Sequence, residues 1–405
     1  MVNKSKKHIL VALVCCGLAA SSIGISINSS GVFYTPVSDS LNILRGSFSM
    51  HMTIFSLVTA ISAFFIPKLM EKFSYKLILT ISVMAAVLAT GAMALAKSIP
   101  MFYLLGAIRG LATSFFSIVP LTLIINQWFE KNHGLVTSIV FGFSGLAGSI
   151  CSPILSHFIE TFGWQTGYLI KAGVILCLCL PAIIYPFHLD PRDDGYLPYG
   201  YVEKNITQTK TTLNFRFITI AFICFFIFSL FCSCITSFTQ HFPGYGKSLG
   251  YSSSLSALLL SAGMIGNVVF KLVIGALSDW LGAMKATVMM IFAVMIGIVL
   301  LIIGNSNIYL LLIGAFLFGS SYALGAVSLP LLTKYFFQVE NYAKAFPSVS
   351  FASNLGAAVS LSMVGYIYDF FGSYVYGFII AFIMISVGIV LLAVTNHQQK
   401  SAKKM

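Results

Sequence analysis

Apolar segments of about 20 residues recur along the whole chain, and they constrain the fold more than any other feature of the sequence. A helix needs about 20 apolar residues to cross the roughly 30 Å hydrocarbon core of a bilayer. The 405-residue chain is 58% hydrophobic and only 8% charged, whereas soluble domains carry about 25% charged residues. The sequence therefore predicts an all-α polytopic membrane protein with twelve transmembrane helices.

The expected spans fall into two sets of six. The first set is 9–34, 47–66, 77–96, 101–126, 134–157 and 165–186, and the second is 216–240, 252–277, 286–304, 308–333, 345–368 and 374–395. The longest polar segment, His188 to Asn214, lies between the two sets. We therefore predict an N-terminal six-helix bundle over residues 1–187, a cytoplasmic central loop over 188–215, and a C-terminal six-helix bundle with its tail over 216–405.

The basic residues indicate how the chain is oriented. The first apolar run follows a basic start, as in a signal peptide, but it is long for one and leads directly into a second span. With both termini in the cytoplasm, the cytoplasmic segments hold 17 of the 23 Lys and Arg residues, and the outer loops hold only Arg45, Lys97 and Lys247. This asymmetry follows the positive-inside rule of cell-membrane proteins. Because the positive charges are spread over many loops, they do not indicate nucleic-acid binding.

The eight cysteines all fall in apolar spans, where a free thiol behaves as a small hydrophobe. We expect no metal site at Cys232 and Cys234, because no histidine or acid lies at the spacing of a tetrahedral site.

The two halves of the chain also repeat each other weakly. At an offset of 208 to 209 residues, Glu71 corresponds to Asp279, and the sequence ETFG at 160–163 corresponds to DFFG at 369–372. Two like-oriented halves with a substrate site at their interface are typical of transporters that work by alternating access. Similar charges in the loops of both halves also satisfy the positive-inside rule without any common origin, so both explanations stay open.

Several motifs together resemble the oxalate/formate antiporter and monocarboxylate transporter branch of the major facilitator superfamily. They are GVFYTPVSDSL at 31–41, NQWFEKNHGLVTSIVFGFSGLAG at 126–148, FGWQTGYLI at 162–170 and GALSDWLGAMK at 275–285. The loop motif of the superfamily is degenerate in the first half, where Pro67, Glu71 and Ser74 replace its usual residues, and is better kept at Gly275, Asp279 and Gly282. The resemblance implies two pseudo-symmetric six-helix bundles and a transporter that needs no cofactor, rather than an enzyme.

Three cations and no acid lie inside the expected spans: Arg109, Lys171 and Lys271. A charge at membrane depth is costly and by default marks a functional site. Lys171 lies about six residues into its span, so we expect its long side chain to snorkel to the outer surface. Arg109 lies about eight residues deep, which predicts either a contact with an anion or a bond to helix-end carbonyls.

Lys271 is the main candidate for binding an anion. Asn267 lies four residues earlier, on the same face of the helix. In the resembled branch the position of Lys271 usually carries an arginine that binds the substrate carboxylate. Lysine keeps the charge of that arginine but loses its bidentate geometry. The alternative is a lysine that snorkels to the cytoplasm, because Gly275, near the span edge, lies only four residues away.

The resemblance adds further candidates for the substrate cavity. Tyr322 falls where the branch commonly has a cavity tyrosine, whose phenol supplies one directed donor, and Phe318 aligns with an aromatic cavity position. Ser353 replaces a second cation of oxalate carriers, which argues against a clamp for two carboxylates. Asn28 replaces a tyrosine of those carriers.

Small residues and loop charges predict how the transporter changes conformation. Gly142, Gly145 and Gly148 repeat every three residues, which favours close helix packing, either as an ordinary contact or as a seam that slides between conformations. Asp279, next to Gly275, is expected to pair with loop cations or to cap the next helix.

Proton coupling is less clear from the sequence. His51 is a candidate group for proton coupling, since histidine titrates near neutral pH. Glu71, the counterpart of Asp279 in the first half, is a candidate for gating and not for proton coupling. Because Asn267 stands where proton-coupled carriers often have an aspartate, symport, exchange and facilitated uptake all stay open.

Together these features predict a monomeric secondary carrier in the cell membrane that moves a small organic anion, with a monocarboxylate favoured, through a cationic central cavity. Protons and a counter-anion are the candidates for coupling. Two alternatives are efflux of amphipathic compounds, suggested by the 36 Phe and 15 Met residues, and a membrane sensor that does not transport.

Overall fold

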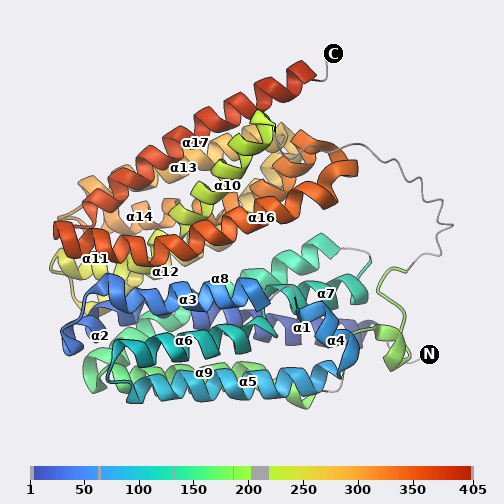
Figure 1. The fold of residues 1–405 in the computed structure, drawn as a ribbon, viewed down its shortest axis with the longest axis horizontal. Coiled ribbons are helices and arrows are strands. Elements are labelled where there is room, and N and C mark those ends of the chain that lie inside the picture. Colours follow the sequence, from blue (N-terminus) through green and yellow to red (C-terminus); the bar gives the residue numbers. More distant parts are fainter. Residues whose placement is uncertain (1–3, 63–64, 131–132, 186, 202–218, 403–405) are drawn as a thin grey trace. The chain divides into compact units, whose positions relative to one another are not determined.

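The structure is a computed structural model that describes residues 4–62, 65–130, 133–185, 187–201 and 219–402 (Figure 1). Within these residues, eleven helical segments are long and apolar enough to cross a membrane. A further helix of 18 residues, α3 (Arg45–Ser62), lies where the second span is expected. The predicted all-helical membrane fold is confirmed.

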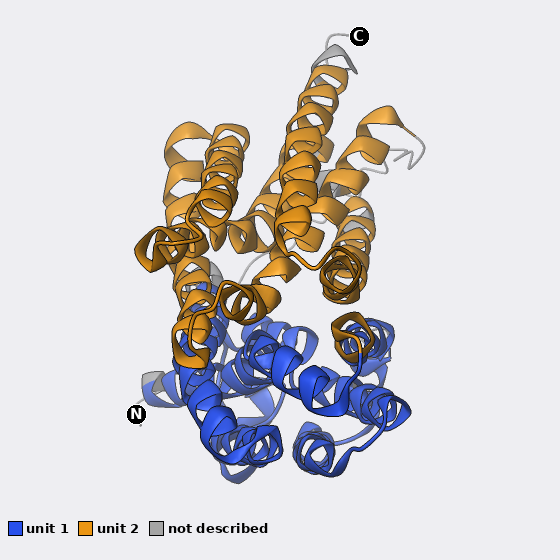
Figure 2. Ribbon diagram, turned by 90° about the vertical axis from the view of Figure 1, so that its left-hand side faces the viewer, with its two compact units in different colours: residues 1–43, 50–205 blue, residues 44–49, 206–405 orange. Residues whose placement is uncertain are grey.

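Two compact units divide the chain, and Figure 2 colours them separately. Unit 1 consists of residues 1–43 and 50–205, and unit 2 consists of residues 44–49 and 206–405. The division after residue 205 falls within the expected central loop, part of which lies outside the described residues.

Unit 1 begins with a helix that changes its winding. After α1 (Lys4–Ala19) the chain continues as the π-helix η1 (Ala20–Asn28) and the 3-10 turn η2 (Ser30–Phe33). The remaining helices are α2 (Tyr34–Leu41), most of α3, α4 (Ile66–Lys72), α5 (Tyr75–Ala92), α6 (Ile99–Ser114), α7 (Ile118–Trp128), α8 (His133–Phe162) and α9 (Trp164–Ile184). The fourth expected span is therefore interrupted between α6 and α7. Apolar residues such as Val11, Leu79 and Ile124 are fully buried in the core of this unit.

Unit 2 contains a helix that the sequence did not predict as continuous. Its helices are α10 (Ile220–Ser237), α11 (Phe242–Ser248), α12 (Ser253–Leu281), α13 (Ala283–Ile303), α14 (Ile308–Phe318), α15 (Ser320–Ala323), α16 (Leu329–Phe371) and α17 (Val375–Ala402). The segment between the tenth and eleventh spans, residues 334–344, is helical and forms part of α16, so one continuous helix joins the end of the tenth span to the eleventh. This polar segment contains no glycine or proline to end the helix.

A series of polar contacts joins α10 and the following turn η5 (Phe238–His241) to α16 (Figure 1). The contacts pair residues 120 positions apart: Ser229 with Val349, Ser233 with Ser353, Ser237 with Ala357, and His241 with Leu361. We call these four contacts the polar ladder. Because both partners advance by four residues at each step, the two helices run parallel and in a fixed register.

The polar ladder requires that the two helices approach closely. A Cβ atom added to Gly356 would overlap the carbonyl oxygen of Leu230 on α10. Glycine lets helix backbones come together in a bilayer, where packing and interhelical hydrogen bonds drive association.

Residues 44–49, at the start of α3, belong to unit 2. The carboxylate of Asp369, near the end of α16, accepts the backbone N–H groups of Arg45 at 3.1 Å and Gly46 at 2.7 Å. The guanidinium of Arg45 lies 4.0 Å from the centre of the Tyr368 ring. Since the first N–H groups of a helix lack partners within the helix and attract negative charge, Asp369 stabilises the start of α3.

Candidate functional site

Lys271 lies on α12 with a half-buried side chain and has no hydrogen-bond or ion-pair partner among the described residues. One turn earlier, Asn267 is 2% exposed, and its side-chain oxygen also has no partner in the described part of the chain. The side-chain nitrogen of Asn267 has only a weak contact, 4.0 Å from the sulfur of Met264. An ammonium and an amide on one helix face are thus left without strong protein partners, which suits the binding of a mobile anion.

The far end of α12 carries the loop motif. Asp279 is exposed, and a Cβ atom added to Gly275 would meet no atom within 4 Å. The structure therefore gives Gly275 no close helix contact within the described residues. The gating roles of these two residues stay predictions.

Tyr322 lies on α15, half-buried, and its hydroxyl is hydrogen-bonded to the side chains of Thr239 and Gln240 on η5. These bonds hold the phenol in place beside the π-helix η6 (Leu324–Ser328). π-helical turns are rare and often occur at functional sites. The structure thus places an oriented phenol next to an irregular segment of the tenth span.

Phe318 and Ser353 both have defined packing roles in unit 2. The Phe318 ring is fully buried and packs edge-on against Phe242, with ring centres 5.3 Å apart. The Ser353 hydroxyl is bonded to that of Ser233 in the polar ladder. Substrate contacts for these two residues stay predictions.

Arg109, on α6, is only 1% exposed, and its guanidinium is held in three directions. Its Nε donates to the Thr90 hydroxyl at 3.1 Å, one terminal nitrogen donates to the Ser26 carbonyl at 3.3 Å, and the other lies 3.4 Å from the sulfur of Met93. The bond to Ser26 is the helix-carbonyl contact that the sequence offered as one alternative. A contact with an anion stays a prediction.

Lys171 does not snorkel to the surface, so that expectation was wrong. Its side chain is 1% exposed, and its Nζ donates to the Ser30 hydroxyl at 2.8 Å and lies 5.2 Å from the centre of the Phe33 ring. Position along a span gives the depth of a residue but not the helix face it occupies. Lys171 lies on the face of α9 that packs against the first span.

Asn28 and the glycines of α8 lie where the first span meets α8. The side-chain nitrogen of Asn28 donates to the carbonyl of Ser144 at 3.3 Å. Gly145 and Gly148 are buried, whereas a Cβ atom added to Gly142 would meet open space.

The remaining two candidates give less information. His51 is buried and lies near the ring of Phe102, with ring centres 6.3 Å apart. Glu71 belongs to α4, but its side chain lies outside the described part of the structure. Proton coupling by His51 and gating by Glu71 stay predictions.

The segment after α9 folds back onto unit 1, which the sequence did not predict. Asp194 accepts hydrogen bonds from the backbone N–H of His188 at 3.0 Å and the His188 ring at 2.9 Å, and it forms an ion pair with Lys7 at 3.2 Å. We call these three residues the linker latch. The Trp128 indole at the end of α7 donates to the carbonyl of His188 at 3.0 Å. The latch thus connects the ends of the first, fourth and sixth spans.

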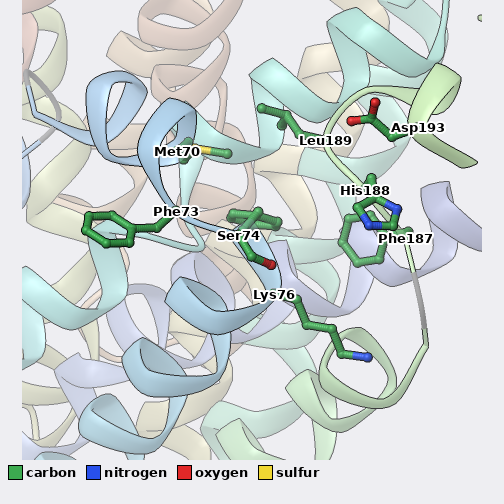
Figure 3. A pocket seen from close by; sticks show the side chains of 9 residues that line it. Met70, Phe73, Ser74, Lys76, Phe187, His188, Leu189 and Asp193 are labelled. Carbon is green, nitrogen blue, oxygen red and sulfur yellow. The ribbon is translucent and has the colours of Figure 1, made fainter.

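A pocket of about 420 Å³ lies beside the linker latch (Figure 3). Its lining consists of Met70, Phe73, Ser74, Tyr75, Lys76, Phe187, His188, Leu189 and Asp193. In Figure 3, Phe73 lies on one side, and His188 and Asp193 lie on the other. Charges of both signs line this pocket, so it does not select for anions.

A family model described as Major Facilitator Superfamily matches residues 14–306. The chain belongs to the Major Facilitator Superfamily. It is a multi-pass membrane protein, and its family is one of transporters and not of enzymes.

Curated relatives match only part of the chain. They are the uncharacterized MFS-type transporter YcxA of Bacillus subtilis (24% identical over 166 residues), MFS-type transporter pytF of Aspergillus terreus (28% over 160 residues) and monocarboxylate transporter 12 of Rattus norvegicus (26% over 209 residues). The matches cover 39% to 45% of this chain and 41% to 50% of the relatives. The chain thus spans half or less of the length of these relatives.

Solved structures match nearly the whole chain. The nucleoside transporter NupG superimposes with a TM-score of 0.71 at 15% identity, covering 98% of this chain and 99% of NupG. A bacterial homolog of the lysosomal transporter Spinster, in an inward-facing and unoccupied conformation, gives 0.62 at 13% identity, covering 99% of this chain and 97% of the homolog. At these identities the likeness shows the shared fold and not the substrate.

Proposed function

We propose that this transporter carries a small organic anion, with a monocarboxylate as the favoured class. The observation that carries the proposal is the pair of Lys271 and Asn267, which has no strong partner in the described part of unit 2. A charged lysine at the centre of a membrane helix costs about 2.5 to 3.5 kcal/mol. An anionic substrate that binds the ammonium offsets this cost and gives the charge a function.

The neutral residues of unit 2 favour one carboxylate rather than two. Lysine acts as a single point charge, unlike the bidentate arginine. Ser353, at the position of the second cation of oxalate carriers, is uncharged and bonded to Ser233. Asn267 and Tyr322 would orient the carboxylate or its neighbouring polar group, and Asn28, Phe318 and Arg109 are further candidate contacts. The similarity to monocarboxylate transporter 12 supports the same class.

Binding of the anion would also drive the transport step. Transfer of an unpaired ammonium into apolar surroundings has a high free-energy cost, and this cost is lower when a carboxylate neutralises the ammonium. Substrate binding at Lys271 therefore lowers the barrier to the conformational change of an alternating-access cycle. We propose a monomer in the cell membrane with cytoplasmic termini, two six-helix bundles over 1–187 and 216–405, and protons or a counter-anion as the coupled species.

The test is uptake of radiolabelled short-chain monocarboxylates and dicarboxylates into proteoliposomes by wild-type protein and by Lys271→Met. Loss of a charge-assisted contact predicts a fall in monocarboxylate uptake of roughly 30-fold or more. Lys97→Met, which removes an exposed lysine before the start of α6, is the matched control and should transport normally. A folded Lys271→Met protein that transports at the wild-type rate would sink the proposal. Stabilisation by lipophilic cations instead of carboxylates would favour efflux of amphipathic compounds.

A further inference from the structure

Arg109 and Lys171, the two buried cations of unit 1, are linked through one carbonyl oxygen. Lys171 donates to the Ser30 hydroxyl at 2.8 Å, and Ser30 in turn donates to the carbonyl of Ser26 at 2.8 Å. The same carbonyl accepts a hydrogen bond from Arg109 at 3.3 Å. The Ser30 hydroxyl in η2 and the Ser26 carbonyl in η1 therefore connect the two cations through a continuous series of hydrogen bonds.

No negative charge balances this pair within the described residues. The contacts of Arg109 and Lys171 are to hydroxyl groups, a carbonyl, a thioether and aromatic rings. The other ionisable side chains that face them are Tyr34, Tyr168 and Cys151, phenols and a thiol that are uncharged in their ordinary form at neutral pH. Because each buried ion costs several kcal/mol unless it is compensated, a bound counter-charge would stabilise the charged form of the pair.

The two cations also have unused hydrogen-bond donors. A guanidinium has five N–H groups and an ammonium has three. Three N–H groups of Arg109 and one of Lys171 have acceptors, which leaves two on each cation without an acceptor in the described structure. Buried donors without acceptors indicate an additional water or ion. Water would accept these bonds but would not neutralise the charge.

We propose that Arg109 and Lys171 bind one small monovalent anion, either a halide or the carboxylate of a short acid. The planar fork of arginine and the mobile ammonium of lysine together suit a compact acceptor with one negative charge. This inference goes beyond the proposed function, because the ligand binds in unit 1 whether or not Lys271 binds the transported anion.

The experiment measures thermal unfolding of the purified full-length protein in sodium chloride, sodium formate and the sodium salt of a bulky sulfonate at equal ionic strength. An anion that binds this site raises Tm in proportion to the logarithm of its concentration once that concentration exceeds Kd, by roughly 5 °C at 100 times its Kd, while the sulfonate does not. A response to chloride alone identifies a halide site, and a response to formate alone identifies a carboxylate site. Equal Tm values in the three salts would overturn the proposal.

Lys171→Met tests whether Lys171 binds the anion. The variant should unfold at a higher temperature than the wild type in the sulfonate, because one of two repelling charges is gone, and should no longer respond to chloride or formate. A response equal to that of the wild type contradicts the proposal. If this variant does not fold, Ser30→Ala is used instead, because it keeps both charges and removes the hydroxyl that Lys171 bonds to. Ser30→Ala should raise the Kd for the anion about tenfold. A Kd equal to that of the wild type, obtained from Tm against anion concentration, is then the contrary result.

Lys271→Met separates this inference from the proposed function. It removes the cation of unit 2 and leaves Arg109 and Lys171 in place, so its Tm should rise with the small anion as in the wild type even when transport is lost. Loss of the Tm response in Lys271→Met would assign the anion effect to α12 and overturn the site in unit 1.

Discussion

The first helices of the two units use their serine hydroxyls differently. In unit 1 the hydroxyls of Ser22, Ser26 and Ser29 donate to carbonyls of their own helix, at 2.7, 3.0 and 2.7 Å. In unit 2 the serines of α10 bond across to α16, at every fourth residue of the polar ladder. Ser237 also donates to the Ser233 carbonyl of its own helix at 3.2 Å. The same residue type thus changes the winding of one helix and fastens the other helix to its neighbour.

The difference has a physical cause. A serine that bonds to its own backbone competes with the regular helical pattern and bends or widens the helix, and η1 is where the first span becomes π-helical. The Ser26 carbonyl in this segment is the one that accepts Arg109 and Ser30. A serine that bonds to another helix leaves its own helix regular and fixes the register of the pair. We infer that unit 1 uses its serines to build a polar site and unit 2 uses them to hold two helices together.

Gly356→Val should produce the largest effect on stability, because its side chain would force apart the two helices that the polar ladder joins. The side chain would overlap the Leu230 carbonyl, and overpacking of this kind costs about 3 kcal/mol or more. We expect a large loss of folded protein in detergent, measured by fluorescence-detected size exclusion and thermal unfolding. Gly275→Val is the matched control in the same unit, because a Cβ atom there meets nothing within 4 Å. Equal loss in both variants would mean that helix propensity, and not the close approach, sets the cost.

Removing three serines from each unit should give a smaller, unequal effect. The triple variant Ser229→Ala, Ser233→Ala, Ser237→Ala loses interhelical bonds that are worth about 0.6 kcal/mol each on average, so we expect a loss of about 2 kcal/mol. Ser22→Ala, Ser26→Ala, Ser29→Ala loses only bonds within one helix and should cost less than half as much. The measurement is the midpoint of thermal unfolding of each variant. If the unit 1 variant is destabilised as much as the unit 2 variant, the contrast between the two helices is wrong.

The sequence predicted most of the membrane-spanning helices, including α12. Membrane spans are encoded by local hydropathy, and the pair of Asn267 and Lys271 follows from helical spacing alone. The continuity of α16 across residues 334–344 does not follow from hydropathy, because the polar residues of this segment suit a loop as well as a helix.

The direction of Lys171 and the linker latch could not be predicted from local pattern. The first depends on which face of α9 packs against η2, and the second on contacts between Lys7 and a segment far along the chain. The local signal that this linker packs against protein is the presence of Phe187 and three tyrosines among the charged residues of 187–201. Long-range pairing of this kind is decided by tertiary packing and leaves little trace in a single sequence.

The linker latch fastens unit 1 through charged and ring groups after α9, whereas the polar ladder fastens unit 2 through buried hydroxyls and a buried histidine. Asp194→Asn tests this contrast and should cost less than Gly356→Val or the triple-serine variant of unit 2, about 1 kcal/mol at neutral pH, since its partners are partly exposed. Asp193→Asn, which removes an exposed neighbouring carboxylate, is the matched control and should leave the unfolding midpoint unchanged.

The pH dependence of the same variant gives the sharper test. Burial raises the pKa of the Asp194 carboxyl, but the hydrogen bonds from His188 and the ion pair with Lys7 outweigh burial and hold the pKa below its ordinary value. A carboxyl group with a lowered pKa in the folded state stabilises the protein fully above its unfolded pKa of about 4 and loses that contribution as the pH falls further. The unfolding midpoints of wild type and Asp194→Asn should therefore differ at pH 7 and converge below about pH 4. A difference that stays constant across this range would show that the latch is held by packing and not by the charge of Asp194.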